Sequence, residues 1–320
     1  MKKIFMCSIV LIVFFVVGNA IADLNDGLVA YYPFNENAND ESGNGNSGTV
    51  NGATLAVDRF GNKNSSYKFD GVDDYIVISD GQDLRLANSD FTLSVWIYET
   101  ERNESFHNAI LTKRGIGSKN GWFYSVVGLQ STNLNITEGK LFYNVSGGGD
   151  ANSISSKILD LKNYHHVVII YNYDELTLRM FIDAELDSVA TNIPSPSSTT
   201  SSDLYIGKDS ADAVDGYYFH GIIDDIRIYN RTLTESEILQ LFHMSHCDAQ
   251  YQLGFEAGKQ FCINNLADCG ITIGLYTEED MQNMVNNLLQ WDINKDNQIG
   301  LVEAVKILRD KAGIIKSPQD

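Results

Sequence analysis

Five side chains that can present oxygen ligands recur at regular positions near the end of the sequence. Asp292, Asn294 and Asp296 are two residues apart, Gln298 follows at the same interval, and Glu303 comes five residues later. Ca²⁺ is bound in this way by side chains at positions 1, 3 and 5 of a loop, a backbone carbonyl at position 7 and a bidentate carboxylate at position 12. The spacing therefore predicts a calcium-binding loop.

The stretch 292–303 resembles an EF-hand loop, and the sequence on both sides supports this interpretation. Thr277 is expected to cap a helix that ends near Trp291, and a second helix is expected from Leu301 to about Lys311. Asn297 stands where glycine is usual, which predicts a modest affinity. An acidic helix-turn-helix without an ion remains the alternative. A dockerin role is not expected, because only one such loop is found.

The same part of the chain contains three of the four cysteines: Cys247, Cys262 and Cys269. In an oxidising compartment we expect Cys262 and Cys269 to form a disulfide, since they flank a short turn. Cys247 would then be the odd cysteine. Zinc binding by these cysteines with His243 and His246 is a less favoured alternative, because the spacing matches no familiar zinc motif.

Two adjacent carboxylates, Asp224 and Asp225, lie in a stretch that reads as a strand. Ile222, Ile226 and Ile228 recur at even spacing, which predicts one buried face that Asp224 interrupts. Neighbouring residues on a strand point to opposite faces, so the two carboxylates are not expected to form a pair. One is expected to face water, and the other needs a cation or a hydrogen-bonding partner.

The elements around these residues have a β pattern. Short alternating strands separated by Gly, Asn, Asp and Ser clusters run through residues 28–241, and Phe91, Leu93, Val95 and Ile97 share one face of such a strand. Helical periodicity begins only at Thr234, where Glu237 three residues later indicates a capping box and a short helix through Phe242. This order is typical of an all-β sandwich or barrel.

Several blocks of sequence resemble the laminin-G-like, concanavalin A-like lectin/glucanase family. The blocks are residues 28–34, 37–45, 69–75, 91–96, 164–168, 204–207 and 219–237. The resemblance implies an antiparallel jelly-roll β-sandwich in which the first and last strands lie side by side. It also implies binding of polysaccharides in most members and hydrolysis in a minority.

Relatives in this family often hold a structural calcium where the first loop meets the last strand. The resemblance implies ligands from Asp40, the Asn44 carbonyl and Asp225. The alternative is that Asp40 and Asn44 are turn residues and Asp225 is solvated.

Candidates for catalysis are few. The glucanase members carry Glu-x-Asp-x-Glu on one strand, whereas here only Glu185-Leu186-Asp187 approaches that pattern, without the second Glu. His165 and His166 start a strand, where core packing is the favoured interpretation. Three further carboxylates, Asp70, Asp73 and Asp74, are interpreted as turn residues.

Four aromatic residues are candidates for stacking on sugars, with packing in the core or at an edge as the alternative. They are Trp122, Tyr124, Tyr217 and Tyr218.

The N-terminus has the layout of a secretory signal peptide. Lys2 and Lys3 precede an apolar run over residues 4–17, and small residues end at Ala22, which predicts cleavage there. We therefore expect a signal peptide at 1–22, a laminin-G-like domain at 23–243 and a helical tail at 244–320. The protein is expected to be secreted, periplasmic or held at the cell surface.

The formal net charge of −19 argues against nucleic acid and anionic membranes as partners. We expect a non-enzymatic, calcium-binding protein that recognises glycan or an extracellular protein. A glycoside hydrolase or lyase of the same fold, or a structural component of the cell surface, are the alternatives.

Overall fold

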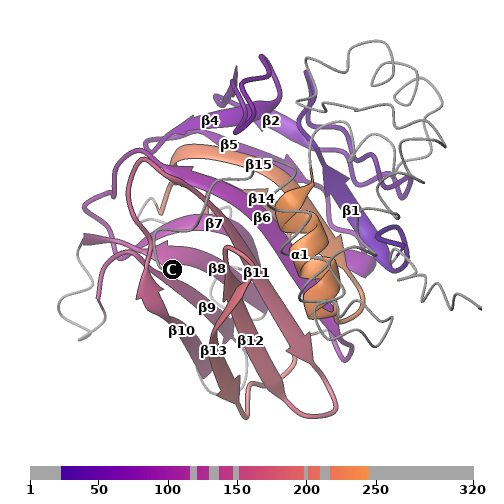
Figure 1. Ribbon diagram of the computed structural model, residues 1–320. Coiled ribbons are helices and arrows are strands. Elements are labelled where there is room, and N and C mark those ends of the chain that lie inside the picture. Colours follow the sequence, from indigo (N-terminus) through magenta and orange to yellow (C-terminus); the bar gives the residue numbers. More distant parts are fainter. Residues whose placement is uncertain are drawn as a thin grey trace, which may run out of the picture. The chain divides into compact units, whose positions relative to one another are not determined.

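The computed structural model describes residues 23–115, 121–129, 137–146, 151–197, 201–209 and 217–244. They form two antiparallel β-sheets and the helix α1 (Figure 1). The expected antiparallel sandwich is confirmed. The predicted signal peptide, the calcium loop at 292–303 and the cysteines lie outside the described residues. Within the described ranges, no helix has the length and apolar character needed to cross a membrane.

We call the larger sheet sheet A. In spatial order its strands are β13 (Glu185–Thr191), β12 (Thr177–Ile182), β11 (Tyr164–Asn172), β6 (Phe91–Glu99), β15 (His220–Tyr229), β4 (Ser66–Asp70) and β3 (Thr54–Ala56), and β1 (Leu28–Tyr32) also pairs with β15. Sheet B contains β10 (Ala151–Ile158), β9 (Lys140–Ser146), β8 (Gly121–Val127), β7 (His107–Arg114), β14 (Leu204–Ile206), β5 (Tyr75–Ile78) and β2 (Thr49–Asn51). The 3₁₀ turn η1 (Asp83–Arg85) follows β5.

The main core lies between the two sheets. The predicted face of β6 is confirmed, because Phe91, Leu93, Val95 and Ile97 are all buried there. Alternation along β8 directs Trp122 and Tyr124 into the same core, where both are fully buried. Of the two interpretations that the sequence left open for these rings, packing in the core is therefore the correct one.

The first and last strands close the sandwich as expected. Leu28 pairs with Tyr229 at one end of β1, and Tyr32 pairs with Ile226 at the other. Since β1 and β15 are far apart in the sequence, their pairing joins the two ends of the β region.

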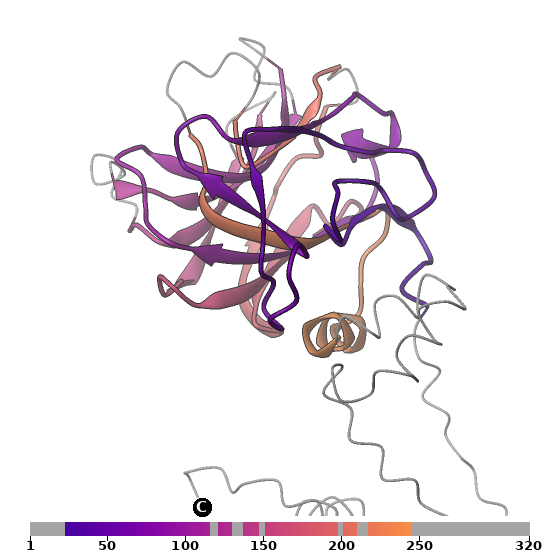
Figure 2. The same ribbon diagram turned by 90° about the horizontal axis from the view of Figure 1, so that it is seen from above.

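The helix α1 (Glu235–His243) packs on the outer face of sheet A. Its capping box is confirmed, with Thr234 accepting a hydrogen bond from the Glu237 backbone N–H and the Glu237 side chain accepting from that of Thr234. A second apolar cluster fills the space beneath it and includes Tyr31, Val168 and Ile238. Figure 2 views α1 almost end-on, outside the sandwich.

The last strand departs from the expected pattern at Asp225. This residue has φ of 45°, and the pairing of β15 with β6 shifts register between Asp224 and Arg227. A residue inserted in this way is a β-bulge, which reverses the facing of the side chains that follow it. The buried isoleucines are Ile223, Ile226 and Ile228, whereas Ile222 is half-buried. The prediction that Ile222, Ile226 and Ile228 share one buried face is therefore wrong for Ile222, which lies before the bulge.

Candidate functional site

Asp224 and Asp225 lie side by side in the structure and are both buried, at 2% and 8% exposure. Nη1 of Arg59 lies 2.9 Å from Oδ2 of Asp224 and 2.7 Å from Oδ2 of Asp225. The expectations that the two carboxylates point apart and that one faces water are therefore wrong, because the bulge places both on one side of the strand. The cation that one of them was expected to need is the Arg59 guanidinium, which pairs with both and comes from the loop after β3.

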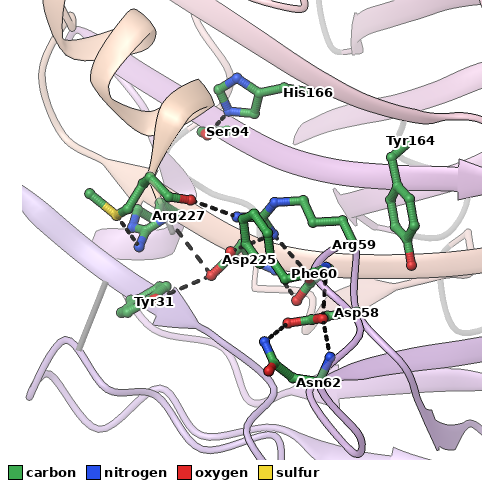
Figure 3. Close-up of polar contacts among 12 residues, drawn as sticks. Tyr31, Asp58, Arg59, Phe60, Asn62, Ser94, Tyr164, His166, Asp225 and Arg227 are labelled. Atoms are coloured by element: carbon green, nitrogen blue, oxygen red, sulfur yellow. Dashed lines mark hydrogen bonds and ion pairs between the residues drawn. The ribbon is translucent and has the colours of Figure 1, made fainter. Parts of the chain in front are cut away.

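Other groups complete a network around these carboxylates. Figure 3 shows Arg59, Tyr31 and Arg227 converging on Asp225. The hydroxyl of Tyr31 donates to Asp225 Oδ1 over 3.1 Å, and the guanidinium of Arg227 lies 4.0 Å from the Tyr31 ring centroid. Arg59 also lies 4.4 Å from the Trp96 ring centroid. The network therefore joins β1, β6, β15 and the loop after β3.

The surroundings of the two carboxylates move their pKa values apart. Burial and the charge of Asp225 raise the pKa of Asp224 well above its usual range, although Arg59 opposes the shift. Burial also raises the pKa of Asp225, but Arg59 and Arg227 more than offset this, so its pKa lies below the usual value. Both guanidiniums thus act on the carboxylate at the bulge.

The structure gives the implied calcium ligands Asp40, Asn44 and Asp225 other partners. Asp40 accepts hydrogen bonds from the backbone N–H groups of Tyr31 and two loop residues, at 2.9 to 3.0 Å. The Asn44 amide donates to the Leu28 carbonyl over 2.9 Å. Asp40 thus binds the backbone of Tyr31, whereas Asp225 accepts a hydrogen bond from the Tyr31 hydroxyl and is paired with Arg59. These contacts match the alternative in which Asp40 and Asn44 are turn residues, whereas Asp225 is buried in an ion pair and is not solvated.

A second group of carboxylates, Asp70, Asp73 and Asp74, has oxygens within 4.8 Å of one another. Asp70 accepts from the N–H groups of Val72 and Asp73, and Asp74 accepts from that of Asp70. These bonds fit the predicted role in a turn between β4 and β5.

The residues considered for catalysis have structural partners. Asp187 accepts from the backbone N–H groups of Ser156 and Lys157 at 2.6 and 2.8 Å, and so links the edge strands of the two sheets. His166 packs at 5.1 Å against Trp96, as expected for a core residue, and its Nε2 lies 2.8 Å from the hydroxyl of Ser94. Its Nδ1 has no hydrogen-bond partner in the described part of the chain.

The outer face of sheet B, opposite the core, carries a row of aromatic and charged side chains. We call it the sheet B face, and its members are Tyr75, His107, Arg114, Phe123, Phe142, Tyr205, Lys208, Asp209, Tyr217 and Tyr218. Of these, only Tyr217 and Tyr218 are candidates for sugar stacking from the sequence alone.

One half of the sheet B face is built around His107. The centroid of its ring lies 4.5 Å from that of Phe142, 5.1 Å from Phe123 and 5.4 Å from Tyr217. The hydroxyl of Ser125 is 3.1 Å from its Nδ1. Burial, together with Arg114, lowers the pKa of His107 to about 4, so the ring is neutral at physiological pH.

Cations pack on the aromatic rings across the rest of the sheet B face. The Arg114 guanidinium lies 4.4 Å from the Phe123 centroid, and its Nε donates to Asp209 over 2.8 Å. The Lys208 ammonium lies 4.4 Å from the Tyr75 centroid and 5.5 Å from that of Tyr205. Aromatic rings can stack on an apolar surface of a ligand. Charged side chains beside them can orient its polar groups through hydrogen bonds.

The sequence contains a weak signal for this face. Phe123 and Phe142 alternate with the core residues of β8 and β9, so both faces of these strands are apolar. An apolar run of this kind does not show by itself which face lies outside.

A laminin G family model, described as the concanavalin A-like lectin/glucanases superfamily, matches residues 70–239. No curated protein sequence matches the chain.

Solved structures with a similar fold include the following three. The binding domain of Paraclostridial Mosquitocidal Protein 1 has a TM-score of 0.54 at 18% identity, over 68% of this chain and 52% of that one. Domain 4 of AbnA has a TM-score of 0.53 at 19% identity, over 68% of this chain and 98% of that one. AbnA is a GH43 extracellular arabinanase from Geobacillus stearothermophilus, and this domain was solved with arabinotriose.

The third is a structure of botulinum neurotoxin type C, whose cell entry depends on interaction with two ganglioside molecules. Its TM-score is 0.52 at 14% identity, over 70% of this chain and 52% of that one. The chain spans about half the length of the two toxin structures. At these identities the similarity establishes the fold alone.

Proposed function

Because this chain belongs to the concanavalin A-like lectin/glucanases superfamily, we propose that it is a non-enzymatic binding protein whose sheet B face recognises glycan. The observation that carries the proposal is the gathering of aromatic rings and charged groups on this face. The outer face of sheet A is different, because α1 packs on it.

The chemistry of the sheet B face suits a sugar. Tyr75 and Tyr217 are half-buried, so part of each ring remains exposed to pack on the C–H surface of a pyranose or furanose. The Arg114 side chain is 24% exposed and offers donors to hydroxyl groups, while the buried carboxylate of Asp209 holds it in place. The structural similarity to an arabinanase domain solved with arabinotriose supports the same ligand class.

A glycan array probed with the full chain tests this proposal. Tyr75→Ala and Tyr217→Ala are expected to weaken binding roughly tenfold each, through the loss of one stacking contact. Tyr173→Ala is the matched control, because Tyr173 is 38% exposed and follows β11 of sheet A. Equal losses in all three variants, or no glycan bound by the wild type, would contradict the proposal. In the latter case an extracellular protein becomes the candidate ligand.

We also propose that the tail at 244–320 binds Ca²⁺ through Asp292, Asn294, Asp296, Gln298 and Glu303. The support is the ligand spacing alone. Isothermal titration with CaCl₂ should show a binding isotherm for the wild type that disappears in Glu303→Ala. An unchanged isotherm in that variant would contradict the proposed loop.

Secretion is a further proposal, supported by the layout of residues 1–22. N-terminal sequencing of protein recovered from the culture medium or periplasm should begin at Asp23. Recovery of an uncleaved chain only from the cell interior would argue against export.

A further inference from the structure

We propose that Arg59 is an internal cation that takes the place of a divalent metal ion at the closure of the sandwich, so that this closure needs no calcium. The inference is independent of the proposed function. It rests on the contacts of one guanidinium with three oxygen atoms and on the charge around them.

Arg59 contacts a set of oxygen atoms of the type that Ca²⁺ prefers. Its Nη1 lies 2.9 Å from Asp224 Oδ2 and 2.7 Å from Asp225 Oδ2, and its Nη2 donates to the Met244 carbonyl over 3.3 Å. Two carboxylates and a backbone carbonyl form a hard, anionic ligand set. The guanidinium already satisfies it, as the dashed contacts in Figure 3 show for Asp225.

The ion pair of Arg59 with the two carboxylates is buried. The side chain of Arg59 is 7% exposed, and those of Asp224 and Asp225 are 2% and 11% exposed. Charge interactions are strong in such a site, because little water screens them. The guanidinium of Arg227 lies a further 4.0 Å from Asp225 Oδ1. A divalent cation added beside two guanidiniums would be repelled, so Arg59 and a metal ion exclude each other here.

The loop that carries Arg59 is held in shape by its own hydrogen bonds. Oδ1 of Asp58 accepts from the backbone N–H groups of Phe60 and Asn62, at 2.9 and 2.8 Å, and its Oδ2 accepts from the Asn62 amide at 2.9 Å. The rings of Phe60 and Trp96 lie 4.2 and 4.4 Å from the guanidinium. These contacts hold the Arg59 side chain against Asp224, which is 165 residues away in the sequence.

The contacts around Asp224 and Asp225 join three parts of the chain. Asp224 and Asp225 belong to β15, Tyr31 on β1 donates to Asp225, and Met244 directly follows α1. Arg227 donates to the sulfur of Met244 over 3.3 Å as well. Arg59 thus connects the last strand to the end of the helix, and Asp225 in turn holds the first strand through Tyr31.

Thermal unfolding of the full chain, with and without calcium, tests the inference. All variants carry Asp292→Ala and Glu303→Ala, so that the predicted loop in the tail does not contribute. In this background we expect the same unfolding midpoint in CaCl₂ and in EGTA. Arg59→Met should lower the midpoint in EGTA by roughly 10 °C, because two buried carboxylates lose their cation.

Calcium should then restore part of the loss in Arg59→Met, since the three oxygens become available to it. Arg59→Met with Asp225→Asn should lose this rescue. Lys157→Met is the matched control: its ammonium pairs with Asp183 at the surface, where it is 46% exposed, and neither a large loss nor a calcium response is expected. If Arg59→Met does not fold in EGTA, its soluble yield on refolding in CaCl₂ provides the same comparison.

A calcium-dependent midpoint in the background that retains Arg59 would overturn the inference. An unchanged midpoint in Arg59→Met, or the absence of calcium rescue, would overturn it as well.

Discussion

Phe242 of α1 lies parallel to Trp96 of β6, with ring centroids 5.6 Å apart and an angle of 12° between the planes. The Arg59 guanidinium and the His166 ring also contact Trp96, at 4.4 and 5.1 Å. Trp96 is thus in contact with the helix, with the buried ion pair and with the buried histidine beneath the helix. The attachment of α1 to sheet A should depend on this ring contact.

Replacing Phe242 with alanine should therefore destabilise the protein. We expect a loss of about 1 to 2 kcal/mol in the free energy of unfolding, since the ring is half-buried and stacked. Leu239→Ala on the same helix is the control, with an expected loss below about 0.5 kcal/mol because Leu239 is 49% exposed. Urea unfolding measures both, and equal losses would contradict the role of the stack.

His166 should make stability depend on pH. Burial, together with Arg59 and Arg227, lowers its pKa from 6.5 to about 3. Between these values the unfolded chain binds a proton that the folded chain does not, so stability falls as the pH falls from 6.5 towards 3. The contribution is at most about 1.4 kcal/mol per pH unit.

Urea unfolding over this pH range should show a shallower dependence for His166→Gln than for the wild type. His243→Gln, at an exposed position of α1, is the control and should keep the wild-type slope. A slope unchanged in His166→Gln would show that the buried ring takes up its proton in the folded state.

Lys113 and Asp80 should respond differently to mutation. The Lys113 side chain is fully buried, and its Nζ lies 2.6 Å from Asp80 Oδ1. Lys113→Met removes both the ion pair and the cost of burying the charge, so we expect a change within about 1 kcal/mol. Asp80→Ala leaves the ammonium buried without this carboxylate, and we expect a loss of about 3 kcal/mol. Urea unfolding distinguishes the two, and a larger loss for Lys113→Met would contradict this assignment.

The turn between β12 and β13 should accept glycine. Ile182 pairs with Glu185, and the two residues between them, Asp183 and Ala184, have φ of 54° and 64°. Positive φ at both positions defines a type I′ turn, in which glycine is favoured. Ala184→Gly should therefore stabilise the protein by about 0.5 kcal/mol. Ala190→Gly, within β13, should instead destabilise it, and the two thermal midpoints should move in opposite directions.

The local elements of the fold could be predicted because their determinants are close together in the sequence. Phe91, Leu93 and Val95 repeat with the period of a strand, and they are buried together. Thr234 and Glu237 supply both halves of a capping box, so the start of α1 needed no distant partner. The order of the matching blocks was enough to predict the sandwich.

The candidate site could not be predicted in the same way. The expectation for Asp224 and Asp225 assumed a regular strand, and a bulge with φ of 45° at Asp225 placed both on one side. Their cation, Arg59, comes from a loop 165 residues away, and no local pattern connects the two. On β8, Trp122 and Phe123 are both buried and aromatic, so composition did not indicate which one faces the core.

The sequence by itself determined the strands and the capped helix, because periodicity and capping act between near neighbours. The closure of the β region by its first and last strands was implied by the resemblance to a known family. Only the tertiary structure decided which charges meet at that closure and which rings line the outer face of sheet B. Those outcomes depend on register and on contacts between distant segments, and a single bulge changes both.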